Sequence, residues 1–271
     1  MNPYPIRTLT NLHIAEVTSN EIPCGLDNLG NTCYISCILQ ALKTIPLLVD
    51  YFLLGRHMDD LIPDSQSTSM SEEFTNVLRH LCFPNASSSF APTSFRDYFQ
   101  QRYSQFLHNA QISQHDCVEF TSLLLSGLHE ELKFGSSPYR RGPGGDRSVH
   151  ADHSIISDVF DGQTQSTITC QQCQHKSVTS HVFQILMLEI PPGDGPFTLK
   201  KCLELYSNPE EMNDVLCSRC NKRGNSTKRM TITIIPPVLV IQLKRFGRNG
   251  SKINSNIILP EKLDLLVGLV P

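Results

Sequence analysis

The strongest constraint on how the second half of the chain can fold comes from two CxxC pairs, Cys170 with Cys173 and Cys217 with Cys220. Each pair presents two sulfur atoms from one tight turn, and a tetrahedral zinc ion takes four such ligands. We therefore expect the fold to bring both turns together around one structural Zn²⁺, with no coordination position left for a catalytic water. The alternative is four cysteines that are only buried or incidental, which the paired spacing disfavours.

The composition is that of an ordinary globular protein. The sequence has 271 residues, ten of them cysteines, and a net charge of −3, which argues against a broadly electrostatic nucleic-acid binder. No apolar run approaches the roughly 18 residues of a membrane span, and residues 1–20 lack the apolar core of a signal peptide. We expect a cytoplasmic or nuclear protein with reduced thiols, no membrane association and no nucleic-acid partner.

Hydrophobic periodicity predicts helices in the first half of the chain and strands in the second. Helices are expected over residues 33–43, after a capping box formed by Ser69 and Glu72, over 93–107, and over 120–132. Residues 135–150 are rich in Gly, Pro, Ser and Arg and indicate a loop. Strands are expected over residues 164–169, 181–190, 227–235 and 238–243. The pattern predicts an α+β architecture with a helical lobe and a sheet lobe.

Cys33 is the strongest candidate for a nucleophile. It follows the Gly/Asn-rich segment 25–31 and opens a helical pattern, with Thr32 as the expected N-cap. The positive end of a helix dipole stabilises a thiolate, and the preceding loop can aim the Asn28 amide at an oxyanion. The alternative is a cysteine that merely packs at a helix start. Cys37, one turn further on, is expected in the core.

The segment Gly25–Tyr34, continuing through residues 39–42, resembles the cysteine box of the ubiquitin-specific proteases. These are papain-like deubiquitinases built as fingers, palm and thumb. Three further segments agree in order. Residues 114–120 resemble the family's Gln-Gln-Asp-Ala box, the CxxC pairs resemble its zinc ribbon, and residues 239–246 resemble its Leu-Lys-Arg-Phe strand.

The resemblance implies a papain-like α+β fold with a helical thumb, zinc-ribbon β fingers and an incomplete β palm. Residues 1–23 would be an N-terminal extension, and residues 24–271 would form a single domain. Its expected parts are a thumb over about 24–134, a loop over about 135–157, and fingers with part of the palm over about 158–271.

The resemblance also implies the site residues and the partners. Cys33 would be the nucleophile and Asn28 an oxyanion-hole donor, while Gln114 and Asp116 would line the approach of the ubiquitin tail. A carboxylate such as Asp116 can pair with the arginines of that tail, and helix capping is the alternative role for it. Ubiquitin and ubiquitinated proteins are the expected partners of a monomeric enzyme.

The chain departs from the family pattern after its last histidine, His181. The family's later histidine box, which supplies the general base, is absent, so we expect a truncated chain with severely impaired turnover. Smaller departures are Ser36-Cys37 after the nucleophile and Cys117 in place of the usual alanine. The readings to compare are a deubiquitinase and a ubiquitin-binding pseudoenzyme or scaffold. A third possible function, a zinc-ribbon nucleic-acid binder, is disfavoured, because the sequence has only one notable basic cluster: Lys222, Arg223, Lys228 and Arg229.

Overall fold

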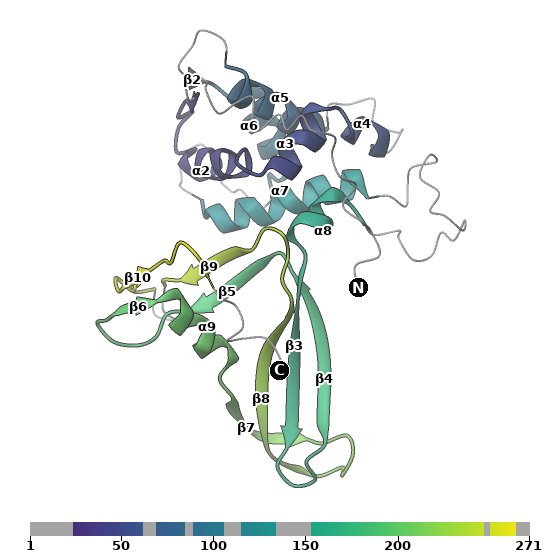
Figure 1. The fold of residues 1–271 in the computed structure, drawn as a ribbon, viewed down its shortest axis with the longest axis vertical. Helices are drawn as coiled ribbons and strands as arrows, with labels where there is room; N and C mark the ends of the chain where they lie inside the picture. Colours follow the sequence, from purple (N-terminus) through teal and green to yellow (C-terminus); the bar gives the residue numbers. More distant parts are fainter. Residues whose placement is uncertain are drawn as a thin grey trace, which may run out of the picture. The chain divides into compact units, whose positions relative to one another are not determined.

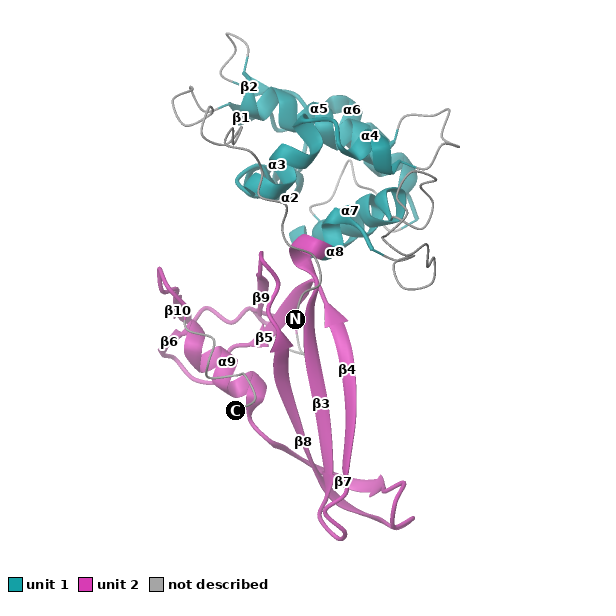
Figure 2. Cartoon of the chain, turned by 45° about the vertical axis from the view of Figure 1, so that its right-hand side comes forward, with its two compact units in different colours: residues 1–157 teal, residues 158–271 magenta. Residues whose placement is uncertain are grey.

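The structure is a computed structural model that describes residues 24–61, 69–84, 89–105, 115–133, 153–246 and 250–263. The chain divides into two compact units, residues 1–157 and residues 158–271 (Figure 2). The predicted N-terminal extension and the predicted loop over 135–150 lie outside the described residues, as does Gln114.

Unit 1 is helical (Figure 1). Its helices are α2 (Cys33–Leu42), α3 (Pro46–Leu53), α4 (His57–Asp60), α5 (Met70–Cys82), α6 (Thr93–Arg102) and α7 (Cys117–Leu132). A short parallel pair joins β1 (Gly25–Leu26), which comes just before α2 in the chain, to β2 (Ser89–Phe90), which lies between α5 and α6. Helix α8 (Ile155–Phe160) begins within the range 135–157 where the sequence indicated a loop.

Phenylalanine side chains fill the core of unit 1. Phe52 of α3 meets Phe74 of α5 edge-on at 5.0 Å between ring centroids, and Phe99 of α6 lies 4.7 Å from Phe120 of α7. All four rings are fully buried. Aromatic pairs at these separations add to the stabilisation from burial itself, so they help to hold α3 against α5 and α6 against α7.

Some helix ends in unit 1 follow the predicted local signals and others differ from the prediction. The capping box of Ser69 and Glu72 is present at the start of α5, and Glu131 of α7 adds a second anchor by accepting from the Met70 and Ser71 amides, each at 2.9 Å. The helix predicted over 93–107 ends at Arg102. Helix α3 was not predicted, although Pro46 at its first turn is a helix-start signal.

Unit 2 is built on a four-stranded antiparallel sheet in the order β4-β3-β8-β7. Its strands are β3 (Gly162–Cys170), β4 (Lys176–Phe183), β7 (Glu210–Leu216) and β8 (Arg223–Ile234). Two parallel pairs complete the unit, β5 (Ile185–Glu189) with β9 (Val240–Lys244) and β6 (Pro196–Thr198) with β10 (Asn256–Ile258). The long hairpins place both CxxC turns at one end of the large sheet (Figure 1).

The single strand predicted over 181–190 is wrong, because the structure has two strands there. Strand β4 pairs with β3 as far as Phe183, and β5 then pairs with β9 from Ile185 onward. Gln184 sits at the break, where its side-chain amide donates to Asp161 Oδ1 at 2.9 Å. Apolar residues lie on both sides of Gln184, so periodicity alone could not locate the change of partner.

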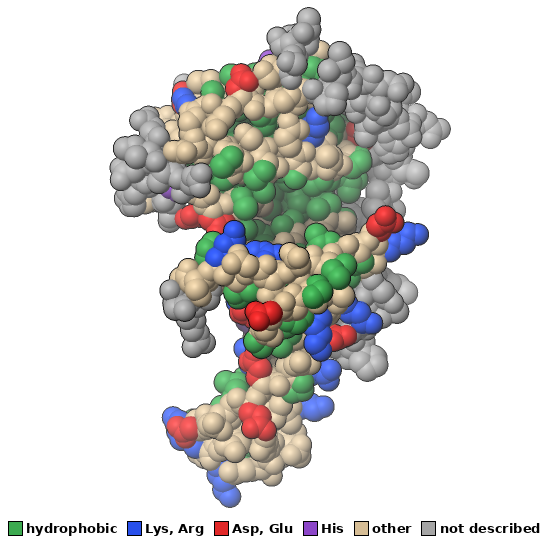
Figure 3. Space-filling view, turned by 90° about the vertical axis from the view of Figure 1, so that its left-hand side faces the viewer, with side chains coloured by type: hydrophobic (Ala, Val, Ile, Leu, Met, Phe, Trp, Pro, Cys, Tyr) green, Lys and Arg blue, Asp and Glu red, His purple; other side chains and the backbone are tan. Residues whose placement is uncertain are grey.

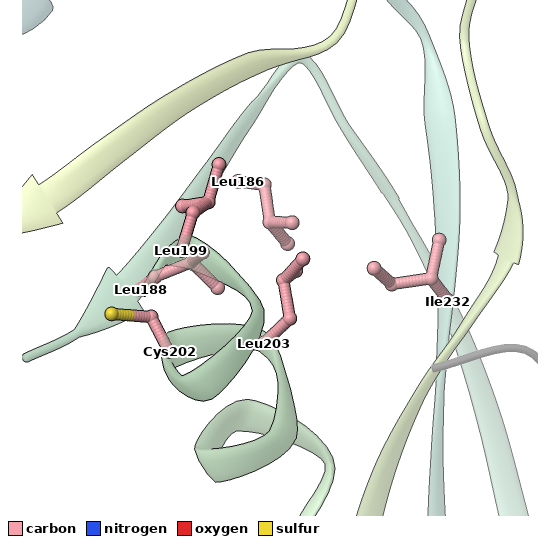
Figure 4. Close-up of a cluster of buried hydrophobic side chains, with 6 residues drawn as sticks. All are labelled: Leu186, Leu188, Leu199, Cys202, Leu203 and Ile232. Carbon is pink, nitrogen blue, oxygen red and sulfur yellow. The ribbon is translucent and has the colours of Figure 1, made fainter. Parts of the chain in front are cut away.

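Helix α9 (Leu199–Ser207) closes the core of unit 2. It begins at Thr198, whose hydroxyl accepts from the Lys201 amide. The buried cluster comprises Leu186, Leu188, Leu199, Cys202, Leu203 and Ile232 (Figure 4). These side chains come from β5, α9 and β8, so α9 joins the small parallel sheet to the base of the long one.

Within the described ranges no single helix is long and apolar enough to cross a membrane. Helices α2 and α3 meet the criterion of length and composition only when taken together, and they are bent by 90° relative to each other.

Candidate functional site

Cys33 is the first residue of α2, and its side chain is exposed. The chain reaches it through a tight turn in which Gly30 and Asn31 both have positive φ, 92° and 53°. The Thr32 carbonyl then accepts from the amides of Ile35 and Ser36 at 3.1 and 3.0 Å, which starts the helix. The thiol therefore stands at the positive end of the dipole of a ten-residue helix.

The Asn28 side chain is held by the loop in one orientation. Its Oδ1 accepts from the Gly30 amide at 3.1 Å and from the Thr32 amide and hydroxyl, each at 3.2 Å. The side-chain oxygen of Asn28 is therefore occupied by hydrogen bonds within the loop. The N–H donors of the same amide can bond to an acceptor outside the loop. An oxyanion needs such a donor, fixed before the reaction begins.

Thr32 occupies the predicted N-cap position but does not cap the helix with its side chain. Its hydroxyl accepts from the Leu29 amide at 2.9 Å and donates to Asn28. The side chain thus stabilises the loop that orients Asn28 rather than the helix end that carries Cys33.

Two long-range hydrogen bonds hold the ends of this loop. Gln40 Nε2 donates to the Cys24 carbonyl at 3.0 Å, and Arg96 Nη1 donates to the Leu29 carbonyl at 3.2 Å. Sequence reasoning missed Arg96, since nothing near residue 96 signals a contact with a loop 67 residues earlier. Gln40 lies in the segment that resembles the cysteine box, but its contact with Cys24 was not foreseen.

An open pocket of about 400 Å³ lies at Cys33. It is lined by Leu26, Asn28, Cys33, Ser36, Cys37 and Gln40. The expectation that Cys37 lies in the core is wrong, because its side chain is exposed. The buried face of α2 is set by Ile35, Leu39 and Leu42, and Cys37 lies roughly 200° around the helix from Ile35.

Asp116 is the N-cap of α7 and is exposed. Its Oδ1 accepts from the Val118 amide at 2.6 Å, so the capping role that the sequence left open is present. Tyr34 of α2 packs edge-on against His115 at 5.5 Å and Phe120 at 5.7 Å between ring centroids. The first turn of α7 therefore lies beside the first turn of α2.

The four CxxC sulfurs lie within 4.8 Å of one another. Cys173 Sγ and Cys217 Sγ are 3.6 Å apart, far beyond the roughly 2.05 Å of a disulfide. Zn–S bonds of about 2.3 Å in a tetrahedron separate the sulfurs by about 3.8 Å. All ten cysteines fall in the described ranges and are free thiols. The four residues therefore fit a tetrahedral metal ion, as the paired spacing predicts.

The two turns that carry these sulfurs have the same backbone geometry. The Cys170 amide donates to the His175 carbonyl at 2.9 Å, and the Cys217 amide donates to the Lys222 carbonyl at 3.0 Å. Gln174 (φ 57°) and Asn221 (φ 53°) occupy the equivalent left-handed position after each pair. Backbone N–H groups of Cys220 and Arg219 lower the pKa of Cys217 to about 6. The pKa of its neighbour Cys173 is raised to about 11, against a backbone N–H of His175, by burial and by the surrounding sulfurs, so without a metal ion one proton is shared within the cluster.

The basic residues near this end of unit 2 do not form a patch of one sign. Arg223 Nη1 lies 2.9 Å from Asp214 Oδ2, and Arg229 Nε donates to the Ser207 carbonyl. Figure 3 shows Lys/Arg and Asp/Glu side chains interspersed at this end. This arrangement matches a solvated rim rather than a surface that follows a phosphate backbone.

The model of the ubiquitin carboxyl-terminal hydrolase family matches residues 24–267. The mouse protein "Ubiquitin carboxyl-terminal hydrolase 21" is 30% identical over 270 residues, which cover 86% of this chain and 47% of that protein. "Ubiquitin carboxyl-terminal hydrolase 4" of Candida glabrata is 31% identical over 282 residues, which cover 92% of this chain and 32% of that protein. The chain thus spans about half or less of the length of these relatives.

Solved structures show the same fold. The SAGA DUB module Ubp8/Sgf11/Sus1/Sgf73 bound to monoubiquitin contains a chain that matches with a TM-score of 0.73 and 26% identity, over 92% of this chain and 54% of that one. The module bound to ubiquitin aldehyde matches with a TM-score of 0.71 and 25% identity, over 91% and 53%. The chain belongs to the ubiquitin carboxyl-terminal hydrolase family and has its α+β, papain-like fold.

Proposed function

We propose that this protein is a cysteine deubiquitinase in which Cys33 is the nucleophile and Asn28 an oxyanion-hole donor. One observation carries the proposal. An exposed thiol at a helix N-terminus shares an open pocket with an amide whose oxygen is tied to its own loop. A cysteine that merely packs at a helix start would be buried and would need no such neighbour.

The chemistry follows from this geometry. The Cys33 thiolate attacks the carbonyl carbon of ubiquitin's C-terminal glycine, and the Asn28 amide donates to the oxyanion that forms. Collapse of this intermediate breaks the isopeptide bond, releases the lysine amine and leaves a thioester, which water hydrolyses. One such donor commonly contributes about 10²- to 10³-fold in rate.

The ubiquitin tail is proposed to approach along the start of α7. Asp116 uses Oδ1 to cap the helix, and it is exposed, so its carboxylate can also pair with a tail arginine. Gln114, outside the described residues, is proposed to act beside it. We further propose a monomer that acts in the cytoplasm or nucleus, where free thiols persist.

Cys170, Cys173, Cys217 and Cys220 are proposed to hold a structural Zn²⁺. Four thiolates fill the coordination shell, so the ion would join the two turns and take no part in the reaction. The separation of the sulfurs and the matched backbone turns support this assignment.

A second function, ubiquitin binding without turnover, is favoured by the histidines. The family's general base belongs to a later box, and no histidine follows His181 in this sequence. Two of the described histidines illustrate structural contacts. His80 stacks on Phe90 at 4.0 Å, and His129 Nδ1 bonds to Ser154 Oγ at 2.8 Å. Loss of a positioned acid–base group commonly costs about 10²- to 10⁴-fold, so these 271 residues alone are expected to turn over poorly.

Hydrolysis of a fluorogenic amide at ubiquitin's C-terminus tests both functions, with ubiquitin affinity and a thermal unfolding curve measured on the same sample. Turnover that disappears in Cys33→Ser supports the deubiquitinase. Binding without turnover supports the second function. A folded sample that neither binds ubiquitin nor turns over the substrate contradicts both.

A further inference from the structure

Three thiols gather where the N-termini of α2 and α7 meet. Cys33 and Cys37 are exposed and line the same pocket, and Cys117 is the first residue of α7. Cys37 and Cys117 are the two positions where this chain carries a cysteine in place of a small residue in the family pattern. The proposed function uses Cys33 and leaves both other thiols unexplained.

A hydrogen bond fixes the side chain of Cys37 on α2. Its Sγ donates to the Tyr34 carbonyl at 3.3 Å, which places the sulfur over the preceding turn of α2. Residues four apart share one helix face, with Cβ atoms about 5–6 Å apart. Cys33 and Cys37 are therefore neighbours on the solvent side of the helix.

The electrostatics of Cys37 agree with this placement. Desolvation raises its pKa first, and the proximity of Cys117 and of Cys33 raises it further. Cys37 therefore rests as a thiol. Because the thiolate is the form that reacts with oxidants, Cys37 is oxidised directly more slowly than a cysteine with an ordinary pKa.

We propose that Cys33 and Cys37 form a reversible disulfide when a hydroperoxide oxidises the nucleophile. The Cys33 thiolate takes one oxygen from hydrogen peroxide, giving a sulfenic acid and hydroxide. The Cys37 sulfur then attacks the Cys33 sulfur, which forms the S–S bond and releases the sulfenic oxygen as water with the Cys37 proton. A dithiol restores both thiols. The formation of this bond does not depend on the proposed function. Its consequence does, because the bond would block catalysis and protect Cys33 from further oxidation only if Cys33 is the nucleophile.

The bond requires a small local change. Cβ atoms about 5–6 Å apart must close to about 3.5–4.5 Å. Cys33 is at the first helical position, where its own N–H has no partner within the helix, so the turn can tighten with the loss of one helical hydrogen bond. The resulting bond is exposed and strained, and such disulfides are readily reduced, as a reversible switch requires.

Peptide mapping of the whole chain tests the bond without relying on turnover. The protein is treated with hydrogen peroxide, free thiols are blocked, and the denatured chain is digested with chymotrypsin, which cleaves after Tyr34 and separates Cys33 from Cys37. The two peptides are expected to stay joined until dithiothreitol is added. In Cys37→Ser the joined species is lost, and Cys33 proceeds to a sulfinic acid that dithiothreitol does not reverse.

Cys117→Ala is the matched control, because alanine is the usual family residue there. The Cys33–Cys37 link is expected to persist in it. The proposal is overturned if Cys37 joins to Cys117 instead, or if Cys33 reaches the sulfinic acid equally with and without Cys37. Neither result bears on ubiquitin hydrolysis, so this test and that of the proposed function fail separately.

Discussion

At the scale of single residues, the Asn28 amide is proposed to act in the reaction and not in the binding of ubiquitin. Its oxygen is occupied by the loop, and its N–H donors are proposed to serve a tetrahedral oxyanion rather than bound ubiquitin. Asn28→Ala is expected to weaken capture of a ubiquitin C-terminal aldehyde by about 10²-fold, the lower range for loss of one oxyanion donor. Affinity for unmodified ubiquitin should stay unchanged. An equal loss of affinity for both ligands would instead assign Asn28 to substrate binding or folding.

His57 makes the stability of unit 1 depend on pH. It is 4% exposed, and its Nε2 lies 3.4 Å from Thr75 Oγ1. Burial lowers its pKa, against opposing effects of Glu72 and Asp60. The native state therefore holds a neutral imidazole, whereas the unfolded chain binds a proton below about pH 6.5.

The free energy of unfolding should consequently fall as pH drops through about 6.5, and should stop falling below the native pKa of His57. Thermal unfolding measured between pH 7.5 and 5 checks this, with His57→Gln as the comparison. The variant should show a smaller decline in melting temperature over that interval. Parallel pH profiles in the two proteins would mean that another group controls the acid response.

Single residues also show where sequence reasoning stops. Local motifs predicted that the four CxxC cysteines come together, and the structure confirms that they do. The same kind of motif makes Cys33 and Asn28 the candidates for the reaction, because the chemistry requires those residue types at that spacing. Arg96 was missed because its hydrogen bond to Leu29 depends on how α6 packs. The prediction that Cys37 lies in the core was wrong, because the position of Cys37 around the helix was not compared with the buried face set by Ile35, Leu39 and Leu42.

At the scale of elements, α7 depends on a close approach at Gly127. A Cβ added there would lie 2.5 Å from Tyr103 Oη, which donates to the Leu123 carbonyl at 2.9 Å. In an open helix, Gly→Ala would stabilise by up to about 1 kcal/mol. Here Gly127→Ala is expected to destabilise, and chemical denaturation measures the difference.

Tyr103→Phe supplies the control for this prediction, since it removes the hydroxyl that the new methyl group would meet. In that background Gly127→Ala should cost less, or should stabilise the protein through helix propensity. A penalty that is the same in both backgrounds would place the conflict elsewhere in α7.

Elements with local signals were predicted well, and those defined by their partners were not. The capping box before α5 and the start of α2 follow from a few adjacent residues. The break at Gln184 does not, because β4 and β5 are distinguished only by pairing with β3 and β9. Strand β7 was missed for the same reason, since its polar sequence forms a strand through pairing with β8.

At the scale of the whole molecule, the zinc site is proposed to hold the end of unit 2 together. One zinc ion per chain is expected, and structural sites of this kind contribute on the order of 10 kcal/mol to local folding. Cys217→Ser should abolish stoichiometric zinc and increase hydrogen exchange in β7 and β8 near the turns. Metal analysis with Cys117→Ala as the control measures the first effect. Full zinc content in Cys217→Ser would contradict the four-sulfur site.

The order of helices and then strands was readable from periodicity along the chain, and the α+β class follows from it. What periodicity could not provide was the assembly of distant segments. The β1–β2 pair and the two CxxC turns each join residues far apart in the chain. Only the meeting of the CxxC turns could be predicted, because their cysteines form a metal-binding motif in the sequence.

The central claim is that Cys33 is the residue on which ubiquitin's C-terminus reacts. The most direct measurement is reaction of the chain with ubiquitin carrying a C-terminal electrophile, followed by mass-spectrometric mapping of the modified cysteine. We expect the adduct on Cys33, no adduct in Cys33→Ser, and unchanged labelling in Cys117→Ala. An adduct on Cys37 or another cysteine, or none on a folded chain that binds ubiquitin, would contradict the claim.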